Sequence, residues 1–239
     1  GSHDWISVLP TSSTKSFSDM QWRLAARLRI GLRVSRASLP HTCPLCFGRI
    51  TDLEHHAFTC NYSEMVSRLK QRHDNIRDSL LGALSAWGIE TEKEPKIQQG
   101  KNFRGDVGVL QPQGPCIIDV SVIHPSPMNT QQNLSVSAAT LVREQEKYNY
   151  YGKLCNDAQK SLIPFAFQTL VVLGKKALDF LSDLKSRPAC LRVFDPVHYV
   201  FAIRQNLSCR LMQANCNLLL RWLQLVLPLS QGGVAYHST

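Results

Sequence analysis

Residues 103–123, FRGDVGVLQPQGPCIIDVSVI, decide the fold. Their apolar side chains follow the pattern of two β-strands separated by a turn. In the first half, Val107 and Val109 fall on one face of a strand. Residues Cys116–Ile123 form a second run that is rich in β-branched side chains. The proline and glycine residues of Gln111–Pro115 indicate the turn between the two runs. The stretch therefore predicts two strands that pair as a hairpin.

An aspartate interrupts the apolar pattern of each predicted strand. Asp106 stands at the start of the first strand and Asp119 lies inside the second. A carboxylate in apolar surroundings is costly to bury without a partner, and two side by side repel each other. A divalent cation removes the repulsion, and oxygen ligands favour Mg²⁺ or Mn²⁺, which activate water for phosphodiester hydrolysis. The alternative, that each aspartate caps a turn or pairs with an arginine, stays open, above all for Asp106.

Three of the eight cysteines and a histidine have the spacing of a zinc site, Cys43-x2-Cys46-x8-His55-x4-Cys60. A Cys-x2-Cys pair lets two thiolates reach one ion, and the later histidine and cysteine complete a tetrahedron that suits Zn²⁺. His56 is an alternative to His55. Because four protein ligands close the coordination sphere, we expect a structural rather than a catalytic zinc. The competing interpretation is a redox Cys-x-x-Cys pair, whose usual βαβ surroundings are missing here.

The remainder of the chain predicts a mixed α/β protein with its clearest boundary near residue 61. Helices are expected at about residues 17–32, 63–87, 131–157, 175–185 and 199–227, and further strands at 91–98 and 163–173. The expected organisation is an N-terminal stretch at 1–13, a basic helix and zinc knuckle at 14–61, a main domain at 62–229 and a flexible tail at 230–239. The arginines of the first helix form either a basic binding face or the solvated side of an amphipathic helix: Arg23, Arg27, Arg29 and Arg33.

The composition favours a soluble protein with an acidic partner. The chain has 239 residues, of which 44% are hydrophobic, and a formal net charge of +9. A sequence pI near 9.3 favours a polyanion, with nucleic acid first. Gly1-Ser2-His3 has the form of a tag remnant, no signal peptide follows, and the apolar stretch Leu218–Pro228 is too short to span a membrane. Isolated cysteines in apolar segments indicate a reducing compartment.

Several motifs also follow one another in a specific order. The knuckle precedes a helix with Arg72-His73-Asp74, Gly105-Asp106 starts a strand, Asp119 follows thirteen residues later, and a helix then carries Arg143-Glu-Gln-Glu-Lys147-Tyr148. Over roughly residues 40–220 this order resembles the restriction-like endonuclease domain of site-specific non-LTR retrotransposons. That domain belongs to the PD-(D/E)XK nuclease superfamily. The resemblance therefore implies a core of order αβββαβ, preceded by a helix and a zinc knuckle and followed by extra helices.

The resemblance also implies a role for each motif residue. The ligands of a catalytic Mg²⁺ or Mn²⁺ would be Asp106, Asp119 and the backbone carbonyl of Val120. The catalytic lysine would be Lys147, with Tyr148 beside it. Residues near the scissile phosphate or along the DNA would be Arg72, His73, Arg104 and Arg143.

Two residues depart from the family pattern. The proline that usually precedes the first acid is Gly105 here. The lysine that usually stands two residues after the second acid is Ser121, so catalysis depends on the migrated Lys147, with Lys153 as the fallback.

In such elements the nuclease nicks target DNA in the nucleus, and the new 3′ end primes reverse transcription. The implied partners are double-stranded DNA and, beyond it, RNA or other domains of the parent polyprotein, with no membrane. Because no polymerase is visible, we expect either an excised part of a longer polyprotein or a domesticated remnant, and the tag remnant favours the excised part. The alternative, favoured by Gly105 and Ser121, is an inactive nuclease fold that binds nucleic acid or a protein. A zinc-stabilised protein-interaction domain would leave the basic charge unexplained.

Overall fold

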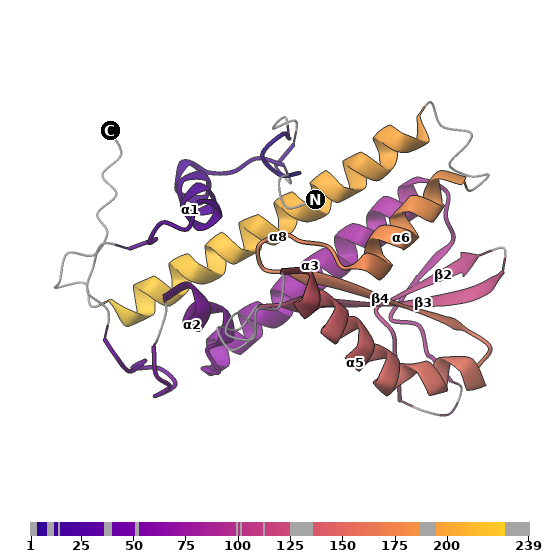
Figure 1. Cartoon of the computed structure of the whole chain (residues 1–239), viewed down its shortest axis with the longest axis horizontal. Coiled ribbons are helices and arrows are strands. Elements are labelled where there is room, and N and C mark those ends of the chain that lie inside the picture. Colours follow the sequence, from indigo (N-terminus) through magenta and orange to yellow (C-terminus); the bar gives the residue numbers. More distant parts are fainter. Residues whose placement is uncertain are drawn as a thin grey trace. The chain divides into compact units, whose positions relative to one another are not determined.

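The computed structural model describes residues 4–8, 12–13, 15–35, 40–50, 53–98, 100, 102–111, 113–124, 136–186 and 195–227. The strands are β1 (Thr91–Lys93), β2 (Val107–Gln111), β3 (Gly114–Ile123) and β4 (Ser161–Gln168). The helices are α1 (Asp19–Arg29), α2 (Leu53–Thr59), α3 (Ser63–Ala86), α5 (Val136–Asp157), α6 (Lys175–Asp183), the short 3-10 helix η1 (Leu184–Ser186) and α8 (Pro196–Val226). The protein is therefore of the mixed α/β class, as the sequence predicts (Figure 1).

The chain forms two compact units, each with its own core. The sheet unit comprises Gly1–Ser16 and His73–Leu211, and the knuckle unit comprises Phe17–Arg72 and Met212–Thr239. The first boundary between these units falls inside α3, between Arg72 and His73. The expected tag remnant at 1–3 and the tail at 230–239 lie outside the described residues.

The predicted hairpin is present and forms the middle of a four-stranded sheet. The strand order is β1-β2-β3-β4, and both β1–β2 and β2–β3 pair antiparallel. Val107 lies opposite Ile118, and Gln111 lies opposite Gly114. Gly114 has a φ of 120°, a conformation that side chains disfavour, so a glycine begins β3 at the end of the turn. The alternating pattern of residues 103–123 therefore specified both the pairing and its position.

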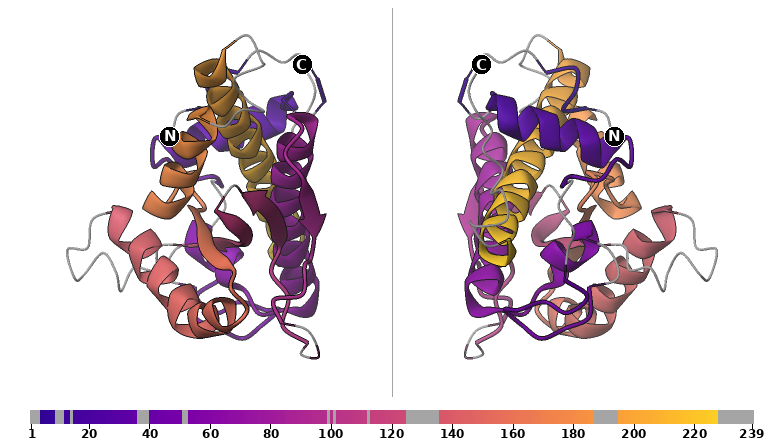
Figure 2. Two further views of the ribbon diagram at one scale, coloured as in Figure 1. Left: turned by 90° about the vertical axis from the view of Figure 1, so that its right-hand side faces the viewer. Right: turned by 90° about the vertical axis from the view of Figure 1, so that its left-hand side faces the viewer.

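The last strand, β4, runs parallel to β3, and α5 is the crossover that this pairing requires. Phe165, Ala166 and Phe167 are all fully buried, as expected for a strand that is covered on both faces. Both α5 and α6 pack against β4 (Figure 2). A buried β4 thus fixes the position of α5, the helix that carries the predicted catalytic lysine.

Two expected strands are shorter in the structure, because the backbone turns sharply at their ends. After β1, Glu94 takes a φ of 50° and Pro95 follows it. After β4, Val171 takes a φ of 67°, and its N–H donates to the carbonyl of Gln168 at 2.8 Å. The predicted spans 91–98 and 163–173 are therefore wrong at their C-terminal ends.

The helix ends show where local signals were read correctly and where one was missed. The predicted stop of α3 is confirmed, because Gly88 takes a φ of 70° two residues after the helix ends at Ala86. The last helix starts at Pro196, three residues before the predicted start. Asp195 caps it by accepting the N–H groups of Val197 and His198 at 2.9 and 3.2 Å. The N-terminal part of the helix predicted from residue 131 lies outside the described residues.

The knuckle unit joins segments from both ends of the chain. Leu24, Ala25 and Leu28 form the buried face of α1. In the same unit, Gln21 Nε2 donates to Asn217 Oδ1 at 2.9 Å, across 196 residues of sequence. Arg221 Nε donates to Glu64 Oε1 at 2.7 Å, across 157 residues. Residues of α8 therefore belong to the same core as the Cys/His cluster.

A glutamate of α5 serves as the cap of α6 in the sheet unit. Gly174 precedes α6 and offers no side chain, but Glu144 Oε1 accepts the N–H of Lys176 at 2.9 Å. A Cβ at Gly174 would collide with the Glu144 carboxylate, so the glycine leaves the room that this cap needs. A negative charge also interacts favourably with a helix N-terminus. The contact fixes α5 against α6 one turn before Lys147.

We predict that Glu144→Ala lowers the free energy of unfolding by about 1 to 2 kcal/mol, as expected for a lost helix cap. Urea unfolding followed by circular dichroism measures the change. Glu146→Ala is the matched control, because Glu146 is exposed on the same helix and its pairing with Arg143 is a surface ion pair. Equal losses for the two variants would contradict the capping role.

Candidate functional site

The two aspartates predicted as metal ligands lie together at the hairpin. Asp106 directly precedes β2, and its N–H donates to the carbonyl of Ile118 at 3.1 Å. Asp106 Oδ2 accepts the N–H of Val120 at 2.7 Å, so its side chain reaches across to β3. The side chains of Asp106 and Asp119 are 17% and 6% exposed. Burial raises the pKa of the Asp119 carboxyl, and the nearby charge of Asp106 raises it further.

The lysine that reaches this pair is Lys147. Its Nζ lies 2.8 Å from Asp119 Oδ2, and its side chain is 17% exposed. The ammonium group also lies over the ring of Tyr151, 5.5 Å from the centroid. Lys147 opposes the rise in the pKa of Asp119, and Arg143, one turn earlier on α5, does so more weakly. Lys153, the fallback lysine, is exposed on α5. The geometry thus favours Lys147 as the partner of the acids.

A histidine of α3 completes the constellation. His73 Nε2 lies 3.2 Å from Asp106 Oδ2 and 3.1 Å from the carbonyl oxygen of Val120. Its other nitrogen, Nδ1, lies 3.3 Å from Asp74 Oδ1. The hydrogen bond with Asp106 raises the pKa of the His73 imidazole to about 9 and outweighs the opposing effect of burial. His73 therefore contacts two of the three groups that were expected to hold a metal.

Several other predicted residues have structural contacts away from the acids. Tyr148 does not join the site in this structure, since its hydroxyl donates to the carbonyl of Leu162 on β4 at 3.0 Å. Arg72, in the knuckle unit, is 5% exposed, and its guanidinium donates to Asn215 Oδ1 at 3.0 Å and lies over the Phe58 ring. Arg104 is exposed and donates to the carbonyl of Glu94. Of the predicted DNA-contacting arginines, Arg72 is thus the least accessible.

The packing around Gly105 and Ser121 bears on the two departures from the nuclease pattern. A Cβ at Gly105 would collide with the side chain of Ile117, and the Gly105 N–H donates to the carbonyl of Pro95 at 3.0 Å. A proline would lose this bond and meet this clash. Ser121 is buried on β3, and Lys147 reaches Asp119 from the neighbouring helix instead. Both departures are therefore compatible with an assembled site.

The sequence analysis missed three residues that shape the site. Tyr151 lies under the Lys147 ammonium, Glu144 holds α5 against α6, and Asp74 faces the free nitrogen of His73. Asp74 and Glu144 each stood inside a motif, Asp74 directly after His73 and Glu144 directly after Arg143, whereas Tyr151 carried no such signal. Tyr151 and Glu144 have ordinary helical spacing, and their roles depend on how α5 packs.

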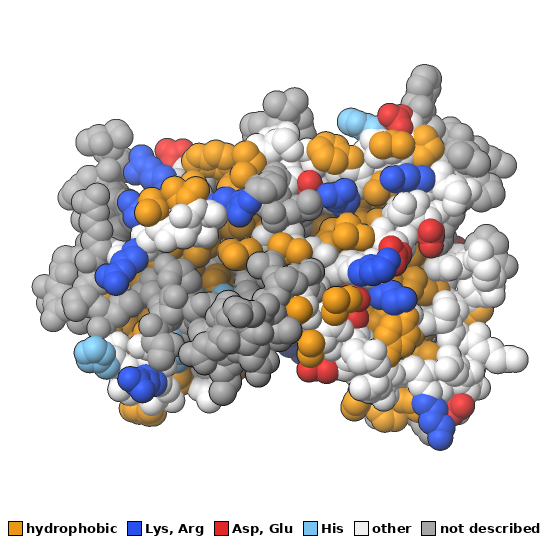
Figure 3. All heavy atoms as spheres, viewed as in Figure 1, with side chains coloured by type: hydrophobic (Ala, Val, Ile, Leu, Met, Phe, Trp, Pro, Cys, Tyr) orange, Lys and Arg blue, Asp and Glu red, His pale blue; other side chains and the backbone are white. Residues whose placement is uncertain are grey.

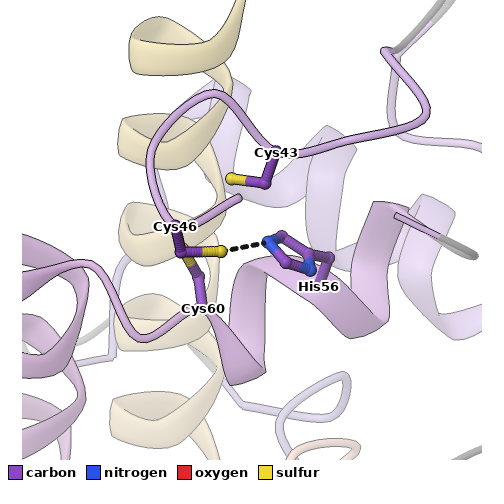
Figure 4. Close-up of side chains that lie close together, drawn as sticks. All are labelled: Cys43, Cys46, His56 and Cys60. Atoms are coloured by element: carbon purple, nitrogen blue, oxygen red, sulfur yellow. Dashed lines mark hydrogen bonds between the residues drawn. The ribbon is translucent and has the colours of Figure 1, made fainter. Parts of the chain in front are cut away.

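The second cluster lies in the knuckle unit and can hold a zinc ion. Figure 4 shows its four side chains pointing toward one another: Cys43, Cys46, His56 and Cys60. Their ligand atoms all lie within 4.8 Å of one another, and Cys46 Sγ lies 3.3 Å from His56 Nε2. Three thiolates and one imidazole are a usual zinc ligand set. The histidine of the group is His56, the alternative to His55, whose side chain lies outside the described residues.

Local backbone structure brings these four residues together. The first two cysteines lie on a tight loop, in which the Cys43 N–H donates to the carbonyl of Gly48 and the Phe47 N–H to that of Cys43, both at 2.8 Å. A Cβ at Gly48 would lie 3.3 Å from both Cys46 Sγ and His56 Cε1, so a glycine keeps this corner open. The short helix α2 carries His56 and ends directly before Cys60.

The electrostatics of the cluster also favour a bound cation. Burial, with a smaller contribution from the neighbouring cysteines, raises the pKa of the Cys60 thiol to about 12. Burial lowers the pKa of His56, which favours the neutral, ligand-competent imidazole. A metal ion offsets the cost of holding several thiolates side by side.

No protein-family model matches this chain, and no curated protein matches it in sequence. In the described part of the chain, no helix is both long enough and apolar enough to cross a membrane.

We predict that His56→Ala loses zinc while His55→Ala retains about one zinc per chain. Elemental mass spectrometry of purified protein measures the metal content. Loss of a structural metal belongs to the largest single-site effects, above about 4 kcal/mol, which corresponds to a fall in melting temperature of about 10 °C for a chain of this size. Zinc loss in His55→Ala alone would show that the other imidazole is the ligand.

We also predict that restoring the family proline is harmful here. Gly105→Pro should lower the free energy of unfolding by about 2 to 4 kcal/mol, from overpacking and a lost hydrogen bond. Urea unfolding measures the effect. As a control, Gly105→Ala should cost less in an Ile117→Ala background than in the unaltered protein, because that background removes the clashing side chain. An unchanged cost would contradict the steric explanation.

Proposed function

We propose that this chain is a metal-dependent endonuclease that hydrolyses a phosphodiester bond of DNA at the site formed by Asp106, Asp119 and Lys147. The observation that carries the proposal is the 2.8 Å contact of Lys147 Nζ with the buried Asp119, whose pKa is also raised by the charge of Asp106 directly before the paired strand. Two adjacent acids and a lysine in one half-buried site are a common arrangement for metal-assisted phosphate chemistry.

The donor set fits Mg²⁺ or Mn²⁺. Asp106 and Asp119 supply carboxylate oxygens, and the Val120 carbonyl oxygen lies close by, since His73 Nε2 is within 3.2 Å of both Asp106 Oδ2 and this carbonyl. Burial and the charge of Asp106 raise the pKa of Asp119, so a cation between the acids would stabilise both in their ionised form. When bound, such a metal polarises the scissile phosphate and lowers the pKa of a water molecule for attack.

Lys147 supplies the positive charge that phosphodiester hydrolysis needs. Its ammonium contacts Asp119 and lies over the Tyr151 ring, so its position is fixed before a substrate arrives. A pre-positioned ammonium stabilises the negative charge that develops on the phosphate oxygens and orients the attacking water. Glu144 supports this role indirectly, because its contact with α6 holds α5 in place.

Exposed arginines support DNA as the substrate. Figure 3 shows several Lys and Arg side chains on the surface around α1, whose arginines lie outside its buried face. In the sheet unit, Arg104 is exposed and Arg143 lies one turn from Lys147 on α5. With a net charge of +9, we propose that these groups contact the phosphate backbone, which makes binding strongly dependent on salt.

We extend the proposal to the biological setting that the motif order resembles. The chain would be the restriction-like endonuclease part of a non-LTR retrotransposon polyprotein, of PD-(D/E)XK type, acting on double-stranded DNA in the nucleus. Its nick would serve target-primed reverse transcription, with RNA or other domains of the polyprotein as further partners. The Cys/His cluster would hold a structural zinc, because all four of its ligands come from the protein.

We predict that zinc-loaded protein nicks supercoiled plasmid only when Mg²⁺ or Mn²⁺ is added. Asp119→Ala should abolish nicking and leave DNA binding intact. Lys147→Met should lower the single-turnover rate by about 10² to 10³-fold, the usual cost of one charge-stabilising group. Lys153→Met is the matched control, because Lys153 is exposed on the same helix, and it should nick at the unaltered rate.

The controls separate this proposal from its main alternative. Asp119→Asn keeps the shape of the side chain and removes its charge, and it should also fail to nick. Loss of nicking in this variant cannot be attributed to a folding defect caused by a smaller side chain. Salt-dependent DNA binding without nicking in Mn²⁺ would support a binding module with an inactive nuclease fold. Nicking by Asp119→Asn at the unaltered rate would refute the site.

A further inference from the structure

We infer that His73 is itself a ligand of the divalent metal ion of the acid pair, and that it gives this site a preference for Mn²⁺ over Mg²⁺. The inference rests on the proposed function, because it concerns the same ion. It goes further in assigning His73 Nε2 to the metal, whereas the motif order implied only that His73 lies near the DNA.

The first argument is the separation of the donor atoms. His73 Nε2 lies 3.2 Å from Asp106 Oδ2 and 3.1 Å from the Val120 carbonyl oxygen. Neighbouring ligands of a six-coordinate ion with bonds of about 2.1 Å are about 3 Å apart. The two observed separations therefore match those of donors that share one ion. The two distances connect the ring nitrogen of His73, on α3, with the Asp106 and Val120 oxygens that the proposed nuclease uses as metal ligands.

The second argument is the partner of the other ring nitrogen. Asp74 Oδ1 lies 3.3 Å from His73 Nδ1. A histidine that binds a metal through one nitrogen usually donates the other N–H to a carboxylate, which fixes the tautomer and the orientation of the ring. Asp74 is held in turn by Arg77 Nη1 at 3.1 Å. This chain of contacts leaves Nε2 facing Asp106 and Val120. In this structure Nε2 donates its N–H to these oxygens, and metal binding would release this proton to solvent.

A rigid set of contacts holds the His73 ring in its orientation before any metal binds. The side chain of Arg77 is 8% exposed and also contacts Asp78 and Glu94, at 2.8 and 2.6 Å. Three carboxylates thus surround one buried guanidinium, and one of them orients His73. The network links α3 to the segment after β1 within the sheet unit, so His73 is not a freely rotating surface side chain.

The identity of the donor explains the metal preference. Mg²⁺ favours an all-oxygen environment and retains its waters, whereas first-row transition metals accept imidazole nitrogen readily. A site with one nitrogen among carboxylate and carbonyl oxygens therefore binds Mn²⁺ more tightly than Mg²⁺. The competing interpretation is that His73 only donates hydrogen bonds to Asp106 and Val120 and stands in for a cation. In that case removal of His73 would strengthen metal binding.

Mn²⁺ binding, and not nicking, provides the test. Zinc-loaded protein is titrated with Mn²⁺ and followed by electron paramagnetic resonance, and Mg²⁺ affinity is measured by competition. We expect His73→Ala to weaken Mn²⁺ binding about tenfold or more and to change Mg²⁺ binding far less. Asn75→Ala is the matched control, because Asn75 is exposed on the same helix, and it should bind Mn²⁺ normally.

Pulsed electron paramagnetic resonance tests the ligand directly. Bound Mn²⁺ should show coupling to ¹⁴N of an imidazole, and this coupling should disappear in His73→Ala and change when histidine is labelled with ¹⁵N. The labelled, unsubstituted protein keeps the test valid if His73→Ala does not fold. Asp74→Asn should weaken binding but keep the nitrogen coupling, since Asp74 orients the ring without touching the metal.

The outcomes distinguish this inference from the proposed nuclease. An oxygen-only Mn²⁺ signal, unchanged or tighter Mn²⁺ binding in His73→Ala, or no Mn²⁺ binding would each overturn the role of His73. Plasmid nicking with an oxygen-only signal would leave the nuclease in place and remove only His73. Bound Mn²⁺ with ¹⁴N coupling but no plasmid nicking would support His73 as a metal ligand and contradict the proposed nuclease activity.

Discussion

The sheet unit depends on one electrostatic constraint, the burial of an ionisable carboxyl inside a strand. Asp119 lies in the middle of β3, and its side chain is 6% exposed. A buried charge of this kind persists only with compensating partners. Lys147 supplies one from α5, and the nearby charge of Asp106 raises the pKa of Asp119 beyond the effect of burial. Any ion pair this deep would be a poor source of stability by itself, which supports a functional reason for keeping it.

Much of the surrounding structure positions the groups around that carboxyl. Parallel pairing with β4 requires a crossover helix, and that helix carries Lys147. The contact of Glu144 with the start of α6 holds α5 against α6, and the hydrogen bond from Tyr148 to the carbonyl of Leu162 connects α5 to β4. On α3, the contacts of Arg77 hold Asp74 against His73. Side chains from two helices, α5 and α3, thus converge on Asp119 and Asp106, and each helix is anchored by a contact outside the site.

The sequence predicted the parts of this arrangement that local patterns encode. Alternation and turn residues specified the hairpin, which places Asp106 directly before β2 and Asp119 inside β3. Cysteine spacing predicted the second cluster, but it could not separate His55 from His56, because the two are adjacent in the sequence. The role of Glu144 and the burial of Arg72 were not predictable, because both depend on packing between segments that are distant in the sequence. Predicted element boundaries were wrong where a single residue sets them. Val171 takes a positive φ after β4, and Asp195 caps the start of α8.

The discontinuous knuckle unit has a consequence for the order of folding. Its contacts from Gln21 to Asn217 and from Glu64 to Arg221 close loops of 196 and 157 residues, whereas the hairpin pairs residues a few positions apart. Closing a long, flexible loop costs entropy that local contacts do not. If the sheet unit folds first, it compacts the chain between the two knuckle segments and shortens the effective loop. The zinc ligands all precede residue 61, so metal binding can begin during synthesis, but the core behind them is completed only when the last helix has been made.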